Sequence, residues 1–156
     1  MEAAAETVLV EREIEIAASP ETVWEFLVDS EKATRWMGCS AALDARPGGQ
    51  YRVEVVPGEV AVGEFVELDP PRRLVHTWGW DTGQMASVPP GSSTVEIELI
   101  PEGEGTTLRF RHSGLPGADA AQKHGHGWAH YLERLRAVAG GDDPGPDPWL
   151  RRNDAS

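Results

Sequence analysis

The sequence predicts an α+β fold in which a curved antiparallel sheet of about seven strands grips one long C-terminal helix. Two observations predict it. Residues 118–139 form the longest uninterrupted helical pattern in the chain, with small and apolar side chains recurring every three or four positions. Before this stretch, strand-like runs alternate with turns rich in glycine and proline, and short turns join neighbouring strands in an antiparallel sense.

The first elements are a strand and two short helices. Residues 7–17 alternate apolar and charged side chains, which is the period of a strand with one buried face. Ser19 is a suitable N-cap, and Pro20 fits the first turn of the helix that follows it. A second short helix is expected next, ending near Trp36 and Met37, where two large apolar side chains can fill a core.

Six further strands are expected between recurring turn signals. Alternation within the last two predicts that Glu96 and Glu98 meet arginines on the outer face of the sheet. The expected strands are Ala42–Ala45, Gln50–Val56, Val60–Leu68, Arg73–Trp80, Ser93–Ile100 and Thr106–Ser113.

The long helix is expected to pack one stripe of side chains on the sheet. Pro116 and Gly117 precede it and Gly140 follows it, as helix boundaries require. About 20 residues give a helix roughly 30 Å long, enough to cross several strands. The predicted buried stripe contains Ala121, Gly125, Trp128, Leu132, Leu135 and Ala139.

The chain is expected to form one domain over residues 8–139, with an N-terminal extension at 1–7 and a flexible C-terminal tail at 140–156. The tail is rich in Gly, Pro and Asp and cannot build a core of its own, although Trp149 within it could dock elsewhere.

Composition narrows the function classes. A formal charge of -12 without a basic cluster in the body of the chain disfavours nucleic-acid binding. No apolar run is long enough to cross a bilayer, and the acidic N-terminus lacks the order of a signal peptide, so a cytoplasmic location is the default expectation. The single Cys39 excludes an internal disulfide, and a small buried apolar role is expected for it.

Several motifs in order carry a family resemblance: ASPETVWEFL, DPPRRLVHTW, STVEIELIPEGEGTTLRFRHSGLP and GWAHYLERL. Over about residues 8–139 the chain resembles the activator-of-heat-shock-ATPase homologue-like branch of the START-like, or SRPBCC, superfamily. This resemblance implies a helix-grip (START/Bet v-like) fold with a cavity between sheet and helix. It also implies that the ligand and the function differ between members, because these include lipid carriers, hormone receptors, polyketide cyclases, aromatases and co-chaperone domains.

Aromatic side chains are the main candidates for the wall of such a cavity. Indole rings offer a large apolar surface with one donor, which suits a flat or apolar ligand, although core packing is an equally valid interpretation for several of them. The expected wall residues are Trp36, Met37, Tyr51, Phe65, Trp78 and Trp80 from the sheet side and Trp128 from the helix.

Three histidines are expected to face the same cavity. Alternation places His76 with Trp78 and places His112 with apolar neighbours, while His124 borders the apolar stripe of the long helix. Imidazoles near a bound ligand can orient it by hydrogen bonds or act as acid and base. The alternative is that each one hydrogen-bonds to backbone at the cavity rim.

Metal and cofactor chemistry have little support in the sequence. His126, His130 and Glu133 have the i, i+4, i+7 spacing of helical metal ligands, but they lie opposite Trp128 and are expected to face solvent. No phosphate loop or dinucleotide fingerprint is present, so no cofactor is expected.

The predicted function is therefore binding of a small apolar or aromatic molecule between sheet and long helix. One alternative is an enzyme of the cyclase, aromatase or dehydratase kind that uses His76, His112 and His124. Another is a regulator of a chaperone ATPase that acts through its surface. The sequence leaves open whether two copies form a homodimer.

Overall fold

The computed structural model describes residues 7–82 and 87–150 and confirms the predicted α+β helix-grip architecture. Residues 1–6 of the expected extension and 151–156 of the expected tail lie outside the described residues. The elements in order are β1 Thr7–Ile16, α1 Pro20–Val28, α2 Ser30–Ala33, β2 Ser40–Leu43, β3 Gln50–Val56, β4 Glu59–Asp69, β5 Arg73–Trp78, β6 Trp80–Thr82, β7 Ser93–Glu102, β8 Gly105–Pro116 and α3 Ala118–Ala139.

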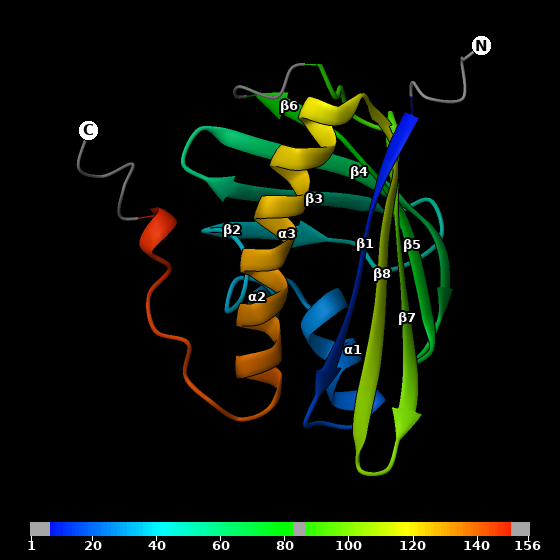
Figure 1. Cartoon of the computed structure of the whole chain (residues 1–156), viewed down its shortest axis with the longest axis vertical. Coiled ribbons are helices and arrows are strands. Elements are labelled where there is room, and N and C mark those ends of the chain that lie inside the picture. The colour runs from blue at the N-terminus through cyan, green and yellow to red at the C-terminus, as the bar shows by residue number, and fades with distance from the viewer. Residues whose placement is uncertain (1–6, 83–86, 151–156) are drawn as a thin grey trace.

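The strands form one antiparallel sheet in the order β1-β8-β7-β5-β4-β3-β2, with β6 paired to β4. The sheet bends strongly, and Figure 1 shows α3 lying across the inner side of the bend, with α1 beside its C-terminal half. The chain order of strand, two short helices, further strands and one long helix is the predicted one. The inner side of the sheet and α3 therefore enclose the core.

The first short helix begins at the predicted Ser19 cap, and an aspartate caps the second. The Ser19 hydroxyl accepts a hydrogen bond from the Thr22 backbone N–H at 3.3 Å, and Pro20 occupies the first helical position. The Asp29 carboxylate accepts from the Lys32 N–H at 3.0 Å and so caps α2. Each cap satisfies an N–H group that the helix itself leaves without a partner.

The expected strand Arg73–Trp80 is wrong at its end, because the strand breaks at Gly79. A Cβ atom on Gly79 would lie 1.7 Å from the Pro89 carbonyl oxygen, so the backbone about ten residues further along the chain lies directly against this position. The β5–β7 pairing ends at Trp78, and β6 pairs with β4 instead. The sequence gives no local sign of this contact beyond the glycine itself.

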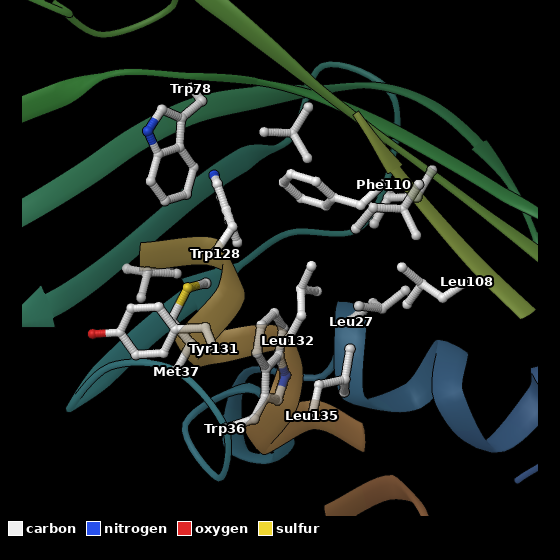
Figure 2. Packing of buried hydrophobic residues seen from close by; sticks show 14 of the residues in the cluster. Leu27, Trp36, Met37, Trp78, Leu108, Phe110, Trp128, Tyr131, Leu132 and Leu135 are labelled. Carbon is white, nitrogen blue, oxygen red and sulfur yellow. The ribbon is translucent and has the colours of Figure 1, made fainter. Parts of the chain in front are cut away.

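The core forms where the inner face of the sheet meets α3, as Figure 2 shows. The predicted helix stripe is buried with one exception, since Ala121 is only partly buried and Ala120 is buried in its place. His124 and Tyr131 are also buried on this face of α3. The facing pairs on β7 and β8 are Val95 with His112, Ile97 with Phe110, and Leu99 with Leu108.

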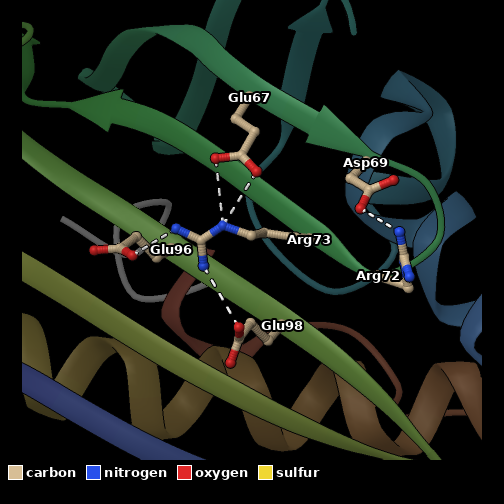
Figure 3. A network of polar contacts seen from close by, with 6 residues as sticks. All are labelled: Glu67, Asp69, Arg72, Arg73, Glu96 and Glu98. Atoms are coloured by element: carbon tan, nitrogen blue, oxygen red, sulfur yellow. Dashed lines mark hydrogen bonds and ion pairs between the residues drawn. The ribbon is translucent and has the colours of Figure 1, made fainter.

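The outer face of the sheet carries alternating charges, as predicted, but the ion pairs differ from a simple cross-strand ladder. Glu96 lies opposite Arg111 and Glu98 opposite Arg109 in the register of β7 and β8. Both glutamates nevertheless pair with Arg73 of β5, at 2.9 and 3.6 Å (Figure 3). Arg73 is therefore the centre of this charged cluster.

Residues 140–150, expected as part of a flexible tail, lie against α3 in the structure. Arg134 of α3 donates to the Gly145 carbonyl at 3.0 Å, and Asp147 is 5% exposed. Trp149 packs against the core as a partly buried side chain. Within the described part of the chain, no helix combines the length and apolarity that a bilayer span requires.

Candidate functional site

A cavity of about 160 Å³ lies between α3 and the strands β3, β5 and β6. Its walls are almost entirely apolar, and four indole rings contribute to them. The lining residues are Met37, Val55, Val56, Glu59, Trp78, Trp80, Lys123, His124, Gly127, Trp128, Tyr131 and Trp149. A larger groove of about 640 Å³ lies between the tail and Trp36, but its lining is polar and charged over much of its surface. We take the smaller cavity as the candidate site because its walls are aromatic.

Four of the predicted wall residues and one of the predicted histidines line this cavity. Trp78 and Trp80 come from the sheet and from β6, although the strand breaks between them. His124 and Trp128 come from α3, and Met37 follows α2. The ring centroids of Trp78 and Trp128 lie 5.0 Å apart, and Figure 2 shows these two rings close to each other. Local strand and helix periodicity therefore placed half of the predicted residues around one space.

The other predicted residues are buried elsewhere in the core. The Tyr51 and His76 rings stack with centroids 3.9 Å apart, and Phe65 packs edge-on against both. Trp36 donates its indole N–H to the Phe26 carbonyl at 2.8 Å, which fixes its ring between helices. None of these four side chains lines the cavity, and neither does His112.

His112 is buried in a chain of hydrogen bonds. Its Nδ1 accepts from the Trp128 indole N–H at 3.0 Å, so the proton of the neutral ring sits on Nε2. Nε2 then donates to the Ser93 hydroxyl at 2.8 Å, and that hydroxyl donates to the Trp78 carbonyl at 2.8 Å. Both ring nitrogens of His112 are therefore engaged inside the protein.

His124 is the predicted histidine that borders the cavity, and it is also fully engaged. Its Nε2 accepts from the Trp80 indole N–H at 3.0 Å. The proton therefore sits on Nδ1, which donates to the Ala120 carbonyl at 2.8 Å. The two hydrogen bonds tie the Trp80 ring to α3 and fix the imidazole as part of the wall.

The three buried histidines stay neutral at pH 7. Burial lowers the pKa of His112 to about 3, and the nearby His124 and His76 lower it further by charge repulsion. Burial also lowers the pKa of His76 to about 4 and lowers that of His124. The site consequently carries no imidazolium charge that would attract an anion.

Two polar atoms of the cavity wall have no hydrogen-bond partner among the described residues: the indole nitrogen of Trp78 and the hydroxyl of Tyr131. Burial raises the pKa of Tyr131 above its ordinary value, and the nearby Asp147 carboxylate raises it further. Both side chains are therefore neutral, and each carries a polar hydrogen that has no acceptor among the described residues.

Sequence reasoning missed Tyr131, Gly127 and Val55 as wall residues and left Trp149 undecided. Tyr131 stands three residues after Trp128 and seven after His124, so helical spacing could have found it. Trp149 had only one signal, a large apolar ring in a stretch otherwise rich in Pro and Asp.

His126 and His130, which have the spacing of helical metal ligands, have a structural role instead. His130 donates from Nε2 to Asp147 at 2.9 Å, and His126 is exposed. No cluster of three or more His, Cys, Asp or Glu side chains that could hold a metal occurs within residues 7–82 and 87–150.

Cys39 is exposed, so the expectation of a buried residue was wrong. It lies just after the Trp36-Met37-Gly38 segment, where the chain comes to the surface.

Comparison with known structures relates this geometry to other proteins. An AHSA1-like protein of Rhizobium etli shares 50% identity, and the match covers 96% of this chain and 92% of that one with a TM-score of 0.75. A putative protein in the dynemicin biosynthetic locus shares 27% identity over 86% of this chain and 48% of that chain, with a TM-score of 0.71.

A third similar structure is the Aha1 dimer from Colwellia psychrerythraea. It shares 19% identity over 90% of this chain and 99% of that chain, with a TM-score of 0.73, and so supports the fold alone. No curated protein sequence matches the chain significantly. The model of the family described as "Activator of Hsp90 ATPase homolog 1-like protein" matches residues 17–140. The chain belongs to this family.

Proposed function

We propose that the protein binds a small apolar molecule with a single aromatic ring in the cavity between α3 and the sheet. The observation that carries the proposal is a space of about 160 Å³ whose walls are almost wholly apolar and include Trp78, Trp80 and Trp128. Indole walls suit flat ligands, because rings gain from offset or edge contacts with other rings.

The volume sets the size of the ligand. An engineered apolar cavity of about 150 Å³ in another protein binds benzene, whereas pockets for drug-sized ligands measure roughly 300–1,000 Å³. A cavity of about 160 Å³ therefore suits one ring with few substituents. A lipid chain or a fused polycyclic compound would require the walls to move. A relative of the same fold in a biosynthetic locus also supports a small-molecule role.

The two alternative functions have less support. Acid–base catalysis by a histidine needs a ring nitrogen available to the substrate, and both nitrogens of His112 and of His124 are engaged in the protein. Regulation of a chaperone ATPase through the surface needs an exposed apolar patch. Among the described residues, Leu9 and Val66 are the only large apolar side chains that are exposed. Ligand binding is therefore the function we propose.

Gly127 provides the test of the proposal. It lines the cavity, and a Cβ atom built on it meets no other atom within 4 Å, so a side chain there would extend into open space. Gly127→Leu is expected to fill the cavity without unfolding the protein, because replacing a mid-helix glycine by a good helix former gains about 0.5–1 kcal/mol. Ala129→Leu adds a similar side chain at an exposed position of the same helix and is the matched control.

The measurement is an NMR titration with toluene as the probe. We expect saturable shifts of the Val55 and Val56 methyl groups and of the Trp80 indole N–H in the wild type and in Ala129→Leu, and none in Gly127→Leu. The proposal fails if toluene gives no saturable shift in the wild type. It also fails if Gly127→Leu binds toluene as well as the wild type does.

A further inference from the structure

The C-terminal segment 144–150 lies beyond residues 17–140, which the family model matches, yet it reaches the cavity. Trp149 is one of the lining residues, together with side chains of the sheet and of α3. In Figure 1 the orange and red segment leaves the end of α3, turns, and runs back in the direction of the helix start. A part of the chain outside the family domain thus contributes to the wall of its cavity.

Trp149 is held by aromatic contacts with one face of α3. Its ring stacks on His130, with centroids 3.8 Å apart and an interplanar angle of 10°. It also stacks on His126 at 5.4 Å and meets the edge of Tyr131 at 5.4 Å and 81°. Tyr131 is itself a cavity residue, so the indole packs directly against the wall of the site.

The backbone around Trp149 is fixed by hydrogen bonds as well. Asp147 Oδ1 accepts from the Trp149 backbone N–H and from His130 Nε2, each at 2.9 Å. Arg134 donates to the Gly145 carbonyl at 3.0 Å. Because His130 and Arg134 both belong to α3, the same helix that lines the cavity also positions the segment that brings Trp149 to its wall.

We infer that Trp149 is a specificity-determining residue of the cavity: it closes the wall over a bound aromatic ring and sets how large and how long-lived the bound ligand is. This inference rests on the proposed function. A rigid indole that both stacks on α3 and faces the cavity adds ring contact at little cost in side-chain entropy. Trp149 is the residue of segment 144–150 that lines the cavity, so loss of its ring contacts is expected to speed ligand dissociation as well as to change the size of the space.

The test uses the full-length protein with toluene as the probe. Trp149→Ala removes the Trp149 ring from the cavity wall, and Trp149→Phe keeps a ring that can stack on His130. Leu150→Ala is the matched control, because Leu150 lies in the same turn and lines the outer groove rather than the cavity. Thermal unfolding of each variant checks that the core is intact, which we expect because Trp149 is only partly buried.

We expect Trp149→Ala to raise the dissociation constant for toluene about tenfold, chiefly through a faster dissociation rate in NMR line-shape analysis. Trp149→Phe is expected to recover most of the affinity, and Leu150→Ala to match the wild type. The inference is overturned alone if wild type binds toluene and Trp149→Ala binds it within twofold and dissociates at the same rate. If the wild type does not bind toluene, both the proposed function and this inference are rejected.

Discussion

The Trp128 indole N–H donates to Nδ1 of His112 at 3.0 Å, inside the core where β8 faces α3. Further hydrogen bonds run from His112 to the Ser93 hydroxyl and from that hydroxyl to the Trp78 carbonyl. The chain of bonds therefore links α3 to β8, β7 and β5. A buried polar chain of this kind stabilises a fold only while every member keeps its partner. His112 bonds to both Trp128 and Ser93, so replacing it removes a partner from each of them.

Replacing His112 by Phe is expected to reduce the free energy of unfolding by about 1–3 kcal/mol, because the buried Trp128 N–H then has no acceptor. Urea unfolding followed by circular dichroism measures the change. His126→Phe is the control, since His126 is an exposed ring on the same helix as Trp128. A stability of His112→Phe equal to that of the wild type would show that the hydrogen bond to Trp128 contributes nothing.

The buried histidines also predict how stability depends on pH. In the unfolded chain their pKa is near 6.5, whereas burial lowers the folded pKa of His112 to about 3 and of His76 to about 4. Below pH 6.5 the unfolded state therefore binds more protons than the folded state, and the free energy of unfolding falls as pH drops from about 6.5 toward 4. Each buried histidine contributes a slope of up to about 1.4 kcal/mol per pH unit.

Urea unfolding at several pH values between 5 and 7 measures this slope in a range where most carboxyl groups stay ionised. His76→Phe removes one titrating ring and keeps a ring that can stack on Tyr51, whose centroid lies 3.9 Å from that of His76. We expect a shallower slope in this variant. An unchanged slope would mean that His76 is not a source of the pH dependence.

The sheet and its inner face could be predicted because strand alternation is a local property. In β7 and β8 the period of two places Ile97 and Phe110 inward and Glu98 outward, and the register agrees. The long helix was predicted from Ala118 to Ala139 because Gly117 and Gly140 mark its ends. These features depend on neighbours in the sequence.

The cavity could be predicted only in part, because its walls depend on contacts between distant residues. Tyr51 and His76 fill the space between them by stacking, which leaves neither one facing the cavity. The alternation pattern cannot distinguish an inward side chain that packs from one that borders a void. The docking of Trp149 on His130 likewise joins two segments whose separate patterns predict a solvent-facing helix surface and a flexible tail.

The contact at Gly79 is another feature that sequence patterns do not reveal, and it gives a third prediction. Gly79→Ala would place a Cβ atom 1.7 Å from the Pro89 carbonyl oxygen, and the backbone at Pro89 would have to move. We expect a loss of at least about 2 kcal/mol in the free energy of unfolding, and a weakened hydrogen bond from the Trp80 N–H to the Val88 carbonyl, now 2.7 Å long. Urea unfolding and amide hydrogen exchange at Trp80 measure the two effects.

Gly127→Ala is the control for that substitution, because the same added Cβ has open space there. It is expected to stabilise the protein by about 0.5–1 kcal/mol, since alanine favours the helix. Equal effects of the two substitutions would show that the backbone at Pro89 tolerates a side chain at Gly79.

The charged cluster on the outer face predicts a dependence on salt. Arg73 contacts Glu67 at 3.3 Å, Glu96 at 2.9 Å and Glu98 at 3.6 Å, and its side chain is 32% exposed (Figure 3). The hydrogen bond to Glu96, with smaller contributions from Glu67, raises the pKa of Arg73 above its ordinary value. One guanidinium thus holds three carboxylates together in a setting that solvent screens only partly.

Arg73→Leu is expected to lower the free energy of unfolding by about 1–2 kcal/mol at low ionic strength, because three neighbouring carboxylates then repel one another without a cation. In 1 M NaCl the loss is expected to shrink, since the Debye length falls to about 3 Å. Arg72→Leu is the matched control: its pair with Asp69 at 2.8 Å involves side chains that are 71% and 47% exposed, and such a pair contributes about 0–1 kcal/mol. Urea unfolding at 0.05 and 1 M NaCl compares the variants, and equal losses for Arg73→Leu and Arg72→Leu at low salt would show that the cluster acts as no more than an ordinary surface pair.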